Sequence, residues 1–173
     1  TCEYSIEEIE RLAKIGFELA MKRSKKLCCI DKANVLETSR LWRQTVQSLE
    51  SNYPEVSVSY EFVDAVAMRL IHSPNYYDVL ITSNLFGDIL TDEASVISGS
   101  MGLMPSASVG LKTSIYEPIH GSFPQAKGKN IANPIATILS ASMMFERSFN
   151  LTDESKLIRD IVNESITKNI VTE

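Results

Sequence analysis

The chain has 173 residues, which is enough for one domain or slightly more and for a core that buries about 70% of the unfolded surface. Apolar residues make up 44% and charged residues 23%, a composition that excludes a disordered or fibrous chain. The net charge of −5 lacks the basic excess of a nucleic-acid-binding protein, and the longest apolar runs are too short for a membrane span. We therefore expect neither nucleic acid nor membrane as a partner.

The three cysteines are an odd count and do not suggest a disulfide framework. Cys28 and Cys29 lie inside an apolar run and are expected to be small core residues. A reducing compartment, the cytoplasm, fits this usage. The chain opens at Thr1 without a methionine, so we expect it to be a piece of a longer protein.

The first hundred residues alternate between helical and strand patterns, which predicts an α/β fold. Ser5 and Glu8 form a capping-box pattern at the start of a helix. In chain order we expect a helix over 6–23, a buried strand over 26–30, a helix that ends near Tyr53, a half-buried strand over 56–60, a helix over 63–71, a strand over 79–82 and a helix over 85–98.

The remaining residues are expected to be mostly loop and helix. Residues 100–113 are predicted to be an irregular loop, Ile115 and Tyr116 a short strand, and residues 117–134 a long functional loop rich in Gly, Pro and Asn. An apolar helix should cover 135–149. Asp153 is expected to cap a last helix that extends to about residue 168, with Leu157, Ile161 and Ile166 facing inward.

Asp88 and Asp92 are the most informative acidic pair. They are four residues apart, so a helix places both on one face with Cβ atoms roughly 5–6 Å apart, where two like charges repel. A divalent cation would offset this repulsion, since Mg²⁺ is commonly held by one or two carboxylates. The competing interpretation is a solvated helix face without a metal.

Other polar residues remain open to two interpretations. Asp64 follows a predicted strand and is either a helix cap or a site residue. Lys32 follows the buried strand, at the strand end where α/β proteins place ligands, and is either a surface cation or a base. His120 lies in the glycine-containing loop, whereas His72 reads as a helix-end residue only. Neither a dinucleotide-binding G-x-G-x-x-G nor a P-loop pattern occurs.

Five stretches together carry a resemblance to one family. They are residues 31–36 (DKANVL), 83–93 (SNLFGDILTDE), 99–108 (GSMGLMPSAS), 116–122 (YEPIHGS) and 130–134 (NIANP). The sequence from about residue 5 to 150 resembles the metal-dependent β-decarboxylating dehydrogenases, which act on isopropylmalate, isocitrate, homoisocitrate or tartrate. Asp31 before Lys32 favours the isopropylmalate branch, because the isocitrate and homoisocitrate branches more often have His there.

The resemblance implies roles for named residues. Asp88 and Asp92 would bind Mg²⁺ or Mn²⁺, and Asp64 would reach the same metal from the partner subunit of a homodimer. Lys32 would cross the same interface as the catalytic base, and Asn34 and Val35 would line the shared substrate pocket. Nicotinamide dinucleotide would be held at the positions of His120, Gly121, Ser122, Gln125 and Asn133.

The resemblance also implies a fold and a reaction. The fold would be that of the isopropylmalate and isocitrate dehydrogenases, a mixed sheet with flanking helices in an incomplete two-domain arrangement. Residues 1–100 would belong to the substrate and dimerisation domain and 101–173 to the dinucleotide-binding domain. The reaction would be NAD-dependent oxidative decarboxylation of 3-isopropylmalate to 2-oxoisocaproate with release of CO₂, a step of leucine biosynthesis.

Two departures from the family pattern matter. The family's first half, with its substrate-binding arginines and a proton-donating tyrosine, is absent, so we expect the chain to be inactive alone. Gln125 replaces the usual Asp, which removes a charge that would repel a 2′-phosphate; NAD stays the expected cofactor, with NADP less firmly excluded. The alternatives are a sister dehydrogenase for isocitrate, homoisocitrate or tartrate, and a non-catalytic dimerisation module.

Overall fold

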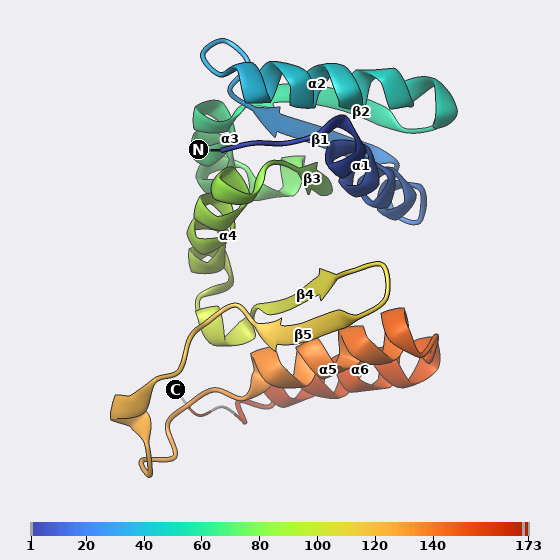
Figure 1. Ribbon diagram of the computed structural model, residues 1–173. Helices are drawn as coiled ribbons and strands as arrows, with labels where there is room; N and C mark the ends of the chain where they lie inside the picture. Colours follow the sequence, from blue (N-terminus) through green and yellow to red (C-terminus); the bar gives the residue numbers. More distant parts are fainter. Residues whose placement is uncertain (1, 171, 173) are drawn as a thin grey trace. The chain divides into compact units, whose positions relative to one another are not determined.

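The computed structural model describes residues 2–170 and residue 172 (Figure 1). The chain divides into two compact units, of which the first ends at Ala94 and the second begins at Ser95. The division falls inside one helix, α4 (Asn84–Ser98). Because each unit has its own packing, the two are described separately.

The first unit alternates helices and strands in the order expected. Its elements are α1 (Ile6–Met21), β1 (Lys26–Asp31), α2 (Glu37–Leu49), η1 (Glu50–Asn52), β2 (Ser57–Phe62), α3 (Val63–His72), η2 (Pro74–Tyr76), β3 (Val79–Ile81) and the first part of α4. The predicted capping box is present, because the Ser5 side chain accepts from the Glu8 backbone and the Glu8 carboxylate accepts from Ser5 N–H. The α/β class is confirmed.

The three strands form a parallel sheet in the order β2-β1-β3, with helices on both faces (Figure 1). On one face, Phe17 of α1 and Val46 of α2 are fully buried against Leu27 and Cys29 of β1. On the other face, a smaller cluster joins Cys28 and Ile30 of β1 to helices α3 and α4. Strand β1 is therefore buried on both faces, as its continuous apolar run predicted.

Two of the three cysteines are core residues, as expected. Cys28 and Cys29 are buried and Cys2 is exposed, and all three thiols are free. Burial raises the pKa of the Cys28 thiol to about 11 and that of Cys29 further. Both buried thiols therefore stay protonated and unreactive near neutral pH.

In the second unit an antiparallel hairpin packs against helix α5, and helix α6 packs against α5. It contains η3 (Met101–Leu103), β4 (Pro105–Val109), β5 (Ser114–Pro118), η4 (Pro124–Ala126), α5 (Ile135–Ser148) and α6 (Thr152–Thr167). Helices α5 and α6 approach closely through small residues, since the Ser142 hydroxyl lies 2.8 Å from that of Ser155 and donates to the Ser155 carbonyl at 2.9 Å. Among the described residues, no helix is long and apolar enough to cross a membrane.

Three expectations about the second half are wrong. Residues 100–113 are not an irregular loop, because 105–109 form β4 and pair with β5. Asp153 does not cap α6; Leu151 holds the cap position without a side-chain hydrogen bond. Helix α6 faces α5 through Ser155 and Val162, so Leu157, Ile161 and Ile166 are exposed at 59%, 55% and 42%. The spacing of the aliphatic residues predicted the wrong buried face, because the α5–α6 contact is formed by small serines, which allow the helices to approach closely.

Candidate functional site at the carboxyl ends of the strands

The candidate site residues of the first unit follow the carboxyl ends of its parallel strands. Lys32 comes directly after β1, Asp64 is the second residue of α3 after β2, and Asp88 and Asp92 lie on α4 after β3. The carboxyl ends of parallel strands share one edge of the sheet, which is where open α/β folds bind ligands. Helix α2 after β1 packs on one face of the sheet, whereas α3 and α4 pack on the other.

Lys32 and Asp64 form an ion pair. The Lys32 Nζ lies 2.5 Å from the Asp64 carboxylate, and the Lys32 ammonium lies 5.6 Å from the centre of the Phe62 ring. The hydrogen bond from Lys32 lowers the pKa of the Asp64 carboxyl, with its own backbone as a further donor. The Lys32 side chain is 24% exposed and that of Asp64 65%, so the pair is open to a ligand on the Asp64 side.

Asp31 supports the turn that carries Lys32. It is 1% exposed, and Arg43 of α2 binds it in a two-pronged manner, Nε to Oδ2 at 2.7 Å and Nη2 to Oδ1 at 3.0 Å. The same carboxylate accepts the Ala33 backbone N–H at 2.8 Å. Sequence reasoning missed Arg43; the available signal was a carboxylate at the end of a buried strand, which requires a cation nearby.

Asn34 and Val35 are in the turn between Lys32 and α2 and are both exposed. The turn is closed by the Val35 and Leu36 backbone N–H groups, which donate to the Lys32 carbonyl at 2.9 Å each. The Arg40 guanidinium donates to the Ala33 carbonyl at 2.9 Å. The side chains of Asn34 and Val35 are therefore displayed on an ordered backbone.

Asp88 and Asp92 lie one turn apart on α4, and both are exposed. The start of this helix is held by a residue near the beginning of the sequence, because the Asn84 backbone N–H donates to the Tyr4 hydroxyl at 3.0 Å. Within residues 2–170 and 172, no three His, Cys, Asp or Glu side chains are close enough to hold a metal ion. One copy of the chain thus does not bring Asp64 to Asp88 and Asp92. The exposed pair has the oxygen donors that Mg²⁺ or Mn²⁺ requires.

The second unit holds the other predicted residues on the loop after β5. His120 is partly buried, and its ring Nδ1 lies 3.0 Å from the Gly121 carbonyl. A Cβ on Gly121 would meet nothing within 4 Å, so the backbone there faces open space that a ligand could use. Ser122 and Gln125 are both exposed further along this loop.

Asn133 ties the end of this loop to the turn before β4. A Cβ on Gly102 would lie 2.8 Å from the Asn133 Cβ, so only glycine fits against this side chain without a shift. The Asn133 side-chain oxygen also accepts the Ile135 backbone N–H at 3.0 Å at the start of α5. Two of the sequence stretches used for the resemblance are therefore brought into contact, which the sequence alone did not indicate.

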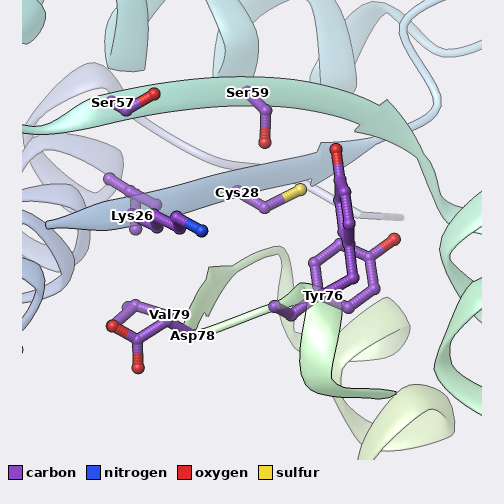
Figure 2. A pocket seen from close by; sticks show the side chains of 9 residues that line it. Lys26, Cys28, Ser57, Ser59, Tyr76, Asp78 and Val79 are labelled. Carbon is purple, nitrogen blue, oxygen red and sulfur yellow. The ribbon is translucent and has the colours of Figure 1, made fainter. Parts of the chain in front are cut away.

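Two hollows in the first unit differ in position. One, of about 430 Å³, lies at the carboxyl end of β1 beside the starts of α2 and α4 and has a mainly apolar lining that includes Leu36, Trp42 and Phe86. The other, of about 170 Å³, lies toward the strands' amino ends, where Figure 2 shows Cys28 with Lys26, Ser59 and Tyr76 around it. The high pKa of Cys28 keeps the thiol in the second hollow protonated at neutral pH.

The fold and site define an α/β protein with a lysine–aspartate pair and a carboxylate-bearing helix at the carboxyl edge of a parallel sheet. A family model described as isocitrate/isopropylmalate dehydrogenase matches residues 1–173. The chain belongs to the isocitrate/isopropylmalate dehydrogenase family, and the resemblance drawn from the five sequence stretches is confirmed.

Relatives named 3-isopropylmalate dehydrogenase support this result. The one from Bacteroides fragilis is 59% identical over 169 residues, which cover 98% of this chain and 48% of the relative. The one from Wolinella succinogenes is 52% identical over 170 residues, which cover 98% of this chain and 46% of the relative. The chain thus spans about half the length of the curated relatives it matches.

Solved structures show the same fold. Isocitrate dehydrogenase from Methylococcus capsulatus superposes with a TM-score of 0.91 at 34% identity, over 96% of this chain and 49% of that one. A β-decarboxylating dehydrogenase from Thermococcus kodakarensis superposes with a TM-score of 0.86 at 35% identity, over 95% of this chain and 48% of that one. The expected dehydrogenase fold class is confirmed.

Proposed function

We propose that this chain is part of an NAD-dependent 3-isopropylmalate dehydrogenase, which converts 3-isopropylmalate to 2-oxoisocaproate and CO₂ in leucine biosynthesis. The supporting observation is the Lys32–Asp64 pair at 2.5 Å, in a chain whose relatives at 51–59% identity carry that name. The cysteine usage makes the cytoplasm the proposed compartment.

Lys32 is the proposed base in the oxidation step. In its neutral form, the Lys32 Nζ accepts the proton of the substrate hydroxyl. The carbon that carries this hydroxyl gives up a hydride, so the C–OH group becomes a carbonyl. NAD⁺, when bound, would supply the nicotinamide ring that takes up this hydride. The β-keto acid that results loses CO₂, and a proton then converts the enolate to the product. The role of Asp64 next to Nζ is to receive a hydrogen bond from it and fix its position.

Asp88 and Asp92 are the proposed ligands of Mg²⁺ or Mn²⁺, together with Asp64 from a second copy of the chain. A divalent ion there would polarise the substrate hydroxyl and stabilise the negative charge of the alkoxide and enolate. The exposure of both aspartates on α4 supports this assignment, because a ligand can reach them from solvent.

A homodimer with shared active sites is the proposed assembly. Helix α3 exposes Met68 and Ile71, at 69% each, and α4 exposes Leu85 and Ile89, at 62% and 55%. Apolar side chains this exposed on neighbouring site-bearing helices are typical of a surface that packs against a partner.

NAD is the proposed cofactor, held by the loop that contains His120, Gly121, Ser122, Gln125 and Asn133. The open backbone at Gly121 supports this, because it leaves room for a phosphate or ribose group to approach. Gln125 can donate and accept hydrogen bonds with ribose hydroxyls. Changing Gln125→Asp should increase the preference for NAD⁺ over NADP⁺ in turnover; an NADP⁺ preference of the unchanged protein would contradict the NAD assignment.

The substrate is tested by NAD⁺ reduction with Mg²⁺ and four acids: 3-isopropylmalate, isocitrate, homoisocitrate and tartrate. The assay uses the protein in which this chain is joined to the remaining half of the family's length. We expect 3-isopropylmalate to be preferred, and preference for another acid would favour the sister-dehydrogenase alternative. The 173-residue chain alone is expected to be inactive; turnover by it would overturn that part of the proposal.

The non-catalytic alternative is tested by Mn²⁺ titration of the same full-length protein. Asp88→Asn and Asp92→Asn should each weaken Mn²⁺ binding by about tenfold or more, since loss of a direct ligand costs at least as much as loss of its support. Asp160→Asn, at an exposed aspartate of α6, is the matched control and should have no effect. Equal affinity in all variants would favour a dimerisation module without a metal site.

A further inference from the structure

The turn that carries Lys32 is attached to the sheet by Asp31, the residue before Lys32. Asp31 is the last residue of β1, and it is buried beneath the turn, with an exposed fraction of 1%. Its Oδ1 accepts the Ala33 backbone N–H at 2.8 Å. The peptide group that follows Lys32 is thereby fixed to one buried carboxylate.

Arg43 completes this anchor from helix α2. It binds both Asp31 oxygens, at 2.7 and 3.0 Å, and its guanidinium lies 5.5 Å from the centre of the Tyr60 ring and 5.3 Å from that of Phe62. The Phe62 ring also lies 5.6 Å from the Lys32 Nζ. One aromatic ring of β2 therefore contacts both the anchoring cation and the proposed base.

We propose that Asp31 and Arg43 are positioning residues, which hold Lys32 in place through the Ala33 backbone and the Phe62 ring. This inference rests on the proposed function, because it assigns a purpose to the order around Lys32. Neither side chain needs to touch the substrate. Asp31 is enclosed by Arg43 and the turn, and Arg43 is directed at Asp31 rather than at Lys32 or Asp64.

The chemistry of the network suits this purpose. A planar guanidinium bound through two nitrogens fixes a carboxylate in orientation as well as distance, which a lysine ammonium cannot do. A proton-transfer base must be held within a fraction of an ångström of its working position, and a misplacement of about 1 Å can cost roughly 100-fold in rate. The two-pronged bond supplies that restraint one residue away from Lys32.

The first test measures the reactivity of Lys32 in the 173-residue chain. Lysines are labelled with a trace of acetic anhydride, and the Lys32 peptide is quantified by mass spectrometry relative to Lys14, which is paired with Glu10 on α1. Arg43→Met should release the turn, separate Lys32 from Asp64 and raise its relative labelling by about threefold or more. The matched control is Arg23→Met, which removes an arginine–aspartate pair to Asp78 before β3 and should leave Lys32 labelling unchanged.

Two further variants keep the test valid if Arg43→Met unfolds because Asp31 is left as an unpaired buried charge. Arg43→Lys keeps the positive charge but loses the two-nitrogen bond to Asp31. Lys32 labelling in this variant should therefore lie between that of the unchanged chain and that of Arg43→Met. The double change Asp31→Asn with Arg43→Met removes both charges and should still raise labelling. Unchanged Lys32 labelling in a folded Arg43→Lys or double variant would refute the positioning role.

The second test measures kinetics in the full-length protein. Arg43→Lys should lower kcat by about tenfold or more while KM for the acid changes little, since the change affects the base and not the binding groups. Equal kcat values would refute the positioning role. Absence of turnover in the unchanged protein would refute the proposed function instead, and the labelling result would then decide whether Asp31 and Arg43 order Lys32.

Discussion

Asp78 connects two segments of the first unit through one carboxylate. It accepts hydrogen bonds from the Ser24 hydroxyl at 2.5 Å and the Ser24 backbone N–H at 2.9 Å, and it pairs with Arg23 at 2.5 Å. These donors, the Ser24 hydroxyl first, lower the pKa of the Asp78 carboxyl. The connection between the turn after α1 and the start of β3 therefore depends on an ionised aspartate.

The lowered pKa makes this contribution pH-dependent. An aspartate with a lower pKa in the folded chain stabilises it above the unfolded-state pKa of about 4, and the contribution is lost as the pH falls through the lowered value. Asp78→Asn should therefore lower the urea midpoint at pH 7, and the difference from the unchanged chain should narrow as the pH falls below about 4. Fluorescence of Trp42, the single tryptophan, reports this unit. A constant difference across this range would contradict the assignment.

At the scale of the elements, α1 lies against β3 because of one glycine. Gly16 is buried in the middle of α1, and a Cβ there would lie 2.4 Å from Cγ2 of Ile81. Ile81 is β-branched and buried, so this methyl group has little freedom to move. The close approach of helix and strand therefore overrides the usual preference for alanine over glycine in a helix.

Gly16→Ala should destabilise the first unit by about 1–3 kcal/mol, as expected for overpacking in a tight core. Urea unfolding followed by Trp42 fluorescence measures the change. In an Ile81→Ala background, where the opposing methyl is gone, the same Gly16→Ala change should cost little or stabilise. Equal losses in both backgrounds would show that the Ile81 contact is not the cause.

The elements of the first unit could be predicted closely from the sequence, and those of the second only in part. The apolar run at residues 26–30 and the capping box at Ser5 are local signals, and both predictions were confirmed, the strand extending one residue further to Asp31. Strand β4 was missed because its Pro, Ser and Ala residues lack strand propensity and acquire a strand conformation by pairing with β5. The Asp31–Arg43 pair was missed because a contact between a strand end and a helix face has no sequence spacing of its own.

For the molecule as a whole, helix α6 leaves an apolar face uncovered. Leu157 and Ile161 are one helical turn apart and more than half exposed, although α6 is already packed on α5 through its other side. Contiguous apolar area of this kind is normally covered. The family relatives are about twice as long as this chain, which leaves a large part of their length available as the cover.

The 173-residue chain should therefore self-associate and bind the dye 8-anilinonaphthalene-1-sulfonate. Changing Leu157→Gln together with Ile161→Gln should lower both dye fluorescence and the apparent mass in analytical ultracentrifugation. Leu111→Gln removes a single exposed aliphatic residue, 88% exposed in the connection between β4 and β5, and should have little effect. Equal decreases in the two variants would mean that the α6 face is not the associating surface.

Asp31 is buried, and the next residue, Lys32, points outward. This alternation limits the insertions and deletions that the chain can accept here. Consecutive residues leaving a strand point in opposite directions, so the order of these two matters as much as their identity. Insertion or deletion of a single residue between Cys29 and Ala33 would direct the lysine toward the core and the aspartate outward. We expect this short stretch to reject length changes even where it accepts substitutions, whereas the exposed connection at residues 111–113 should accept both.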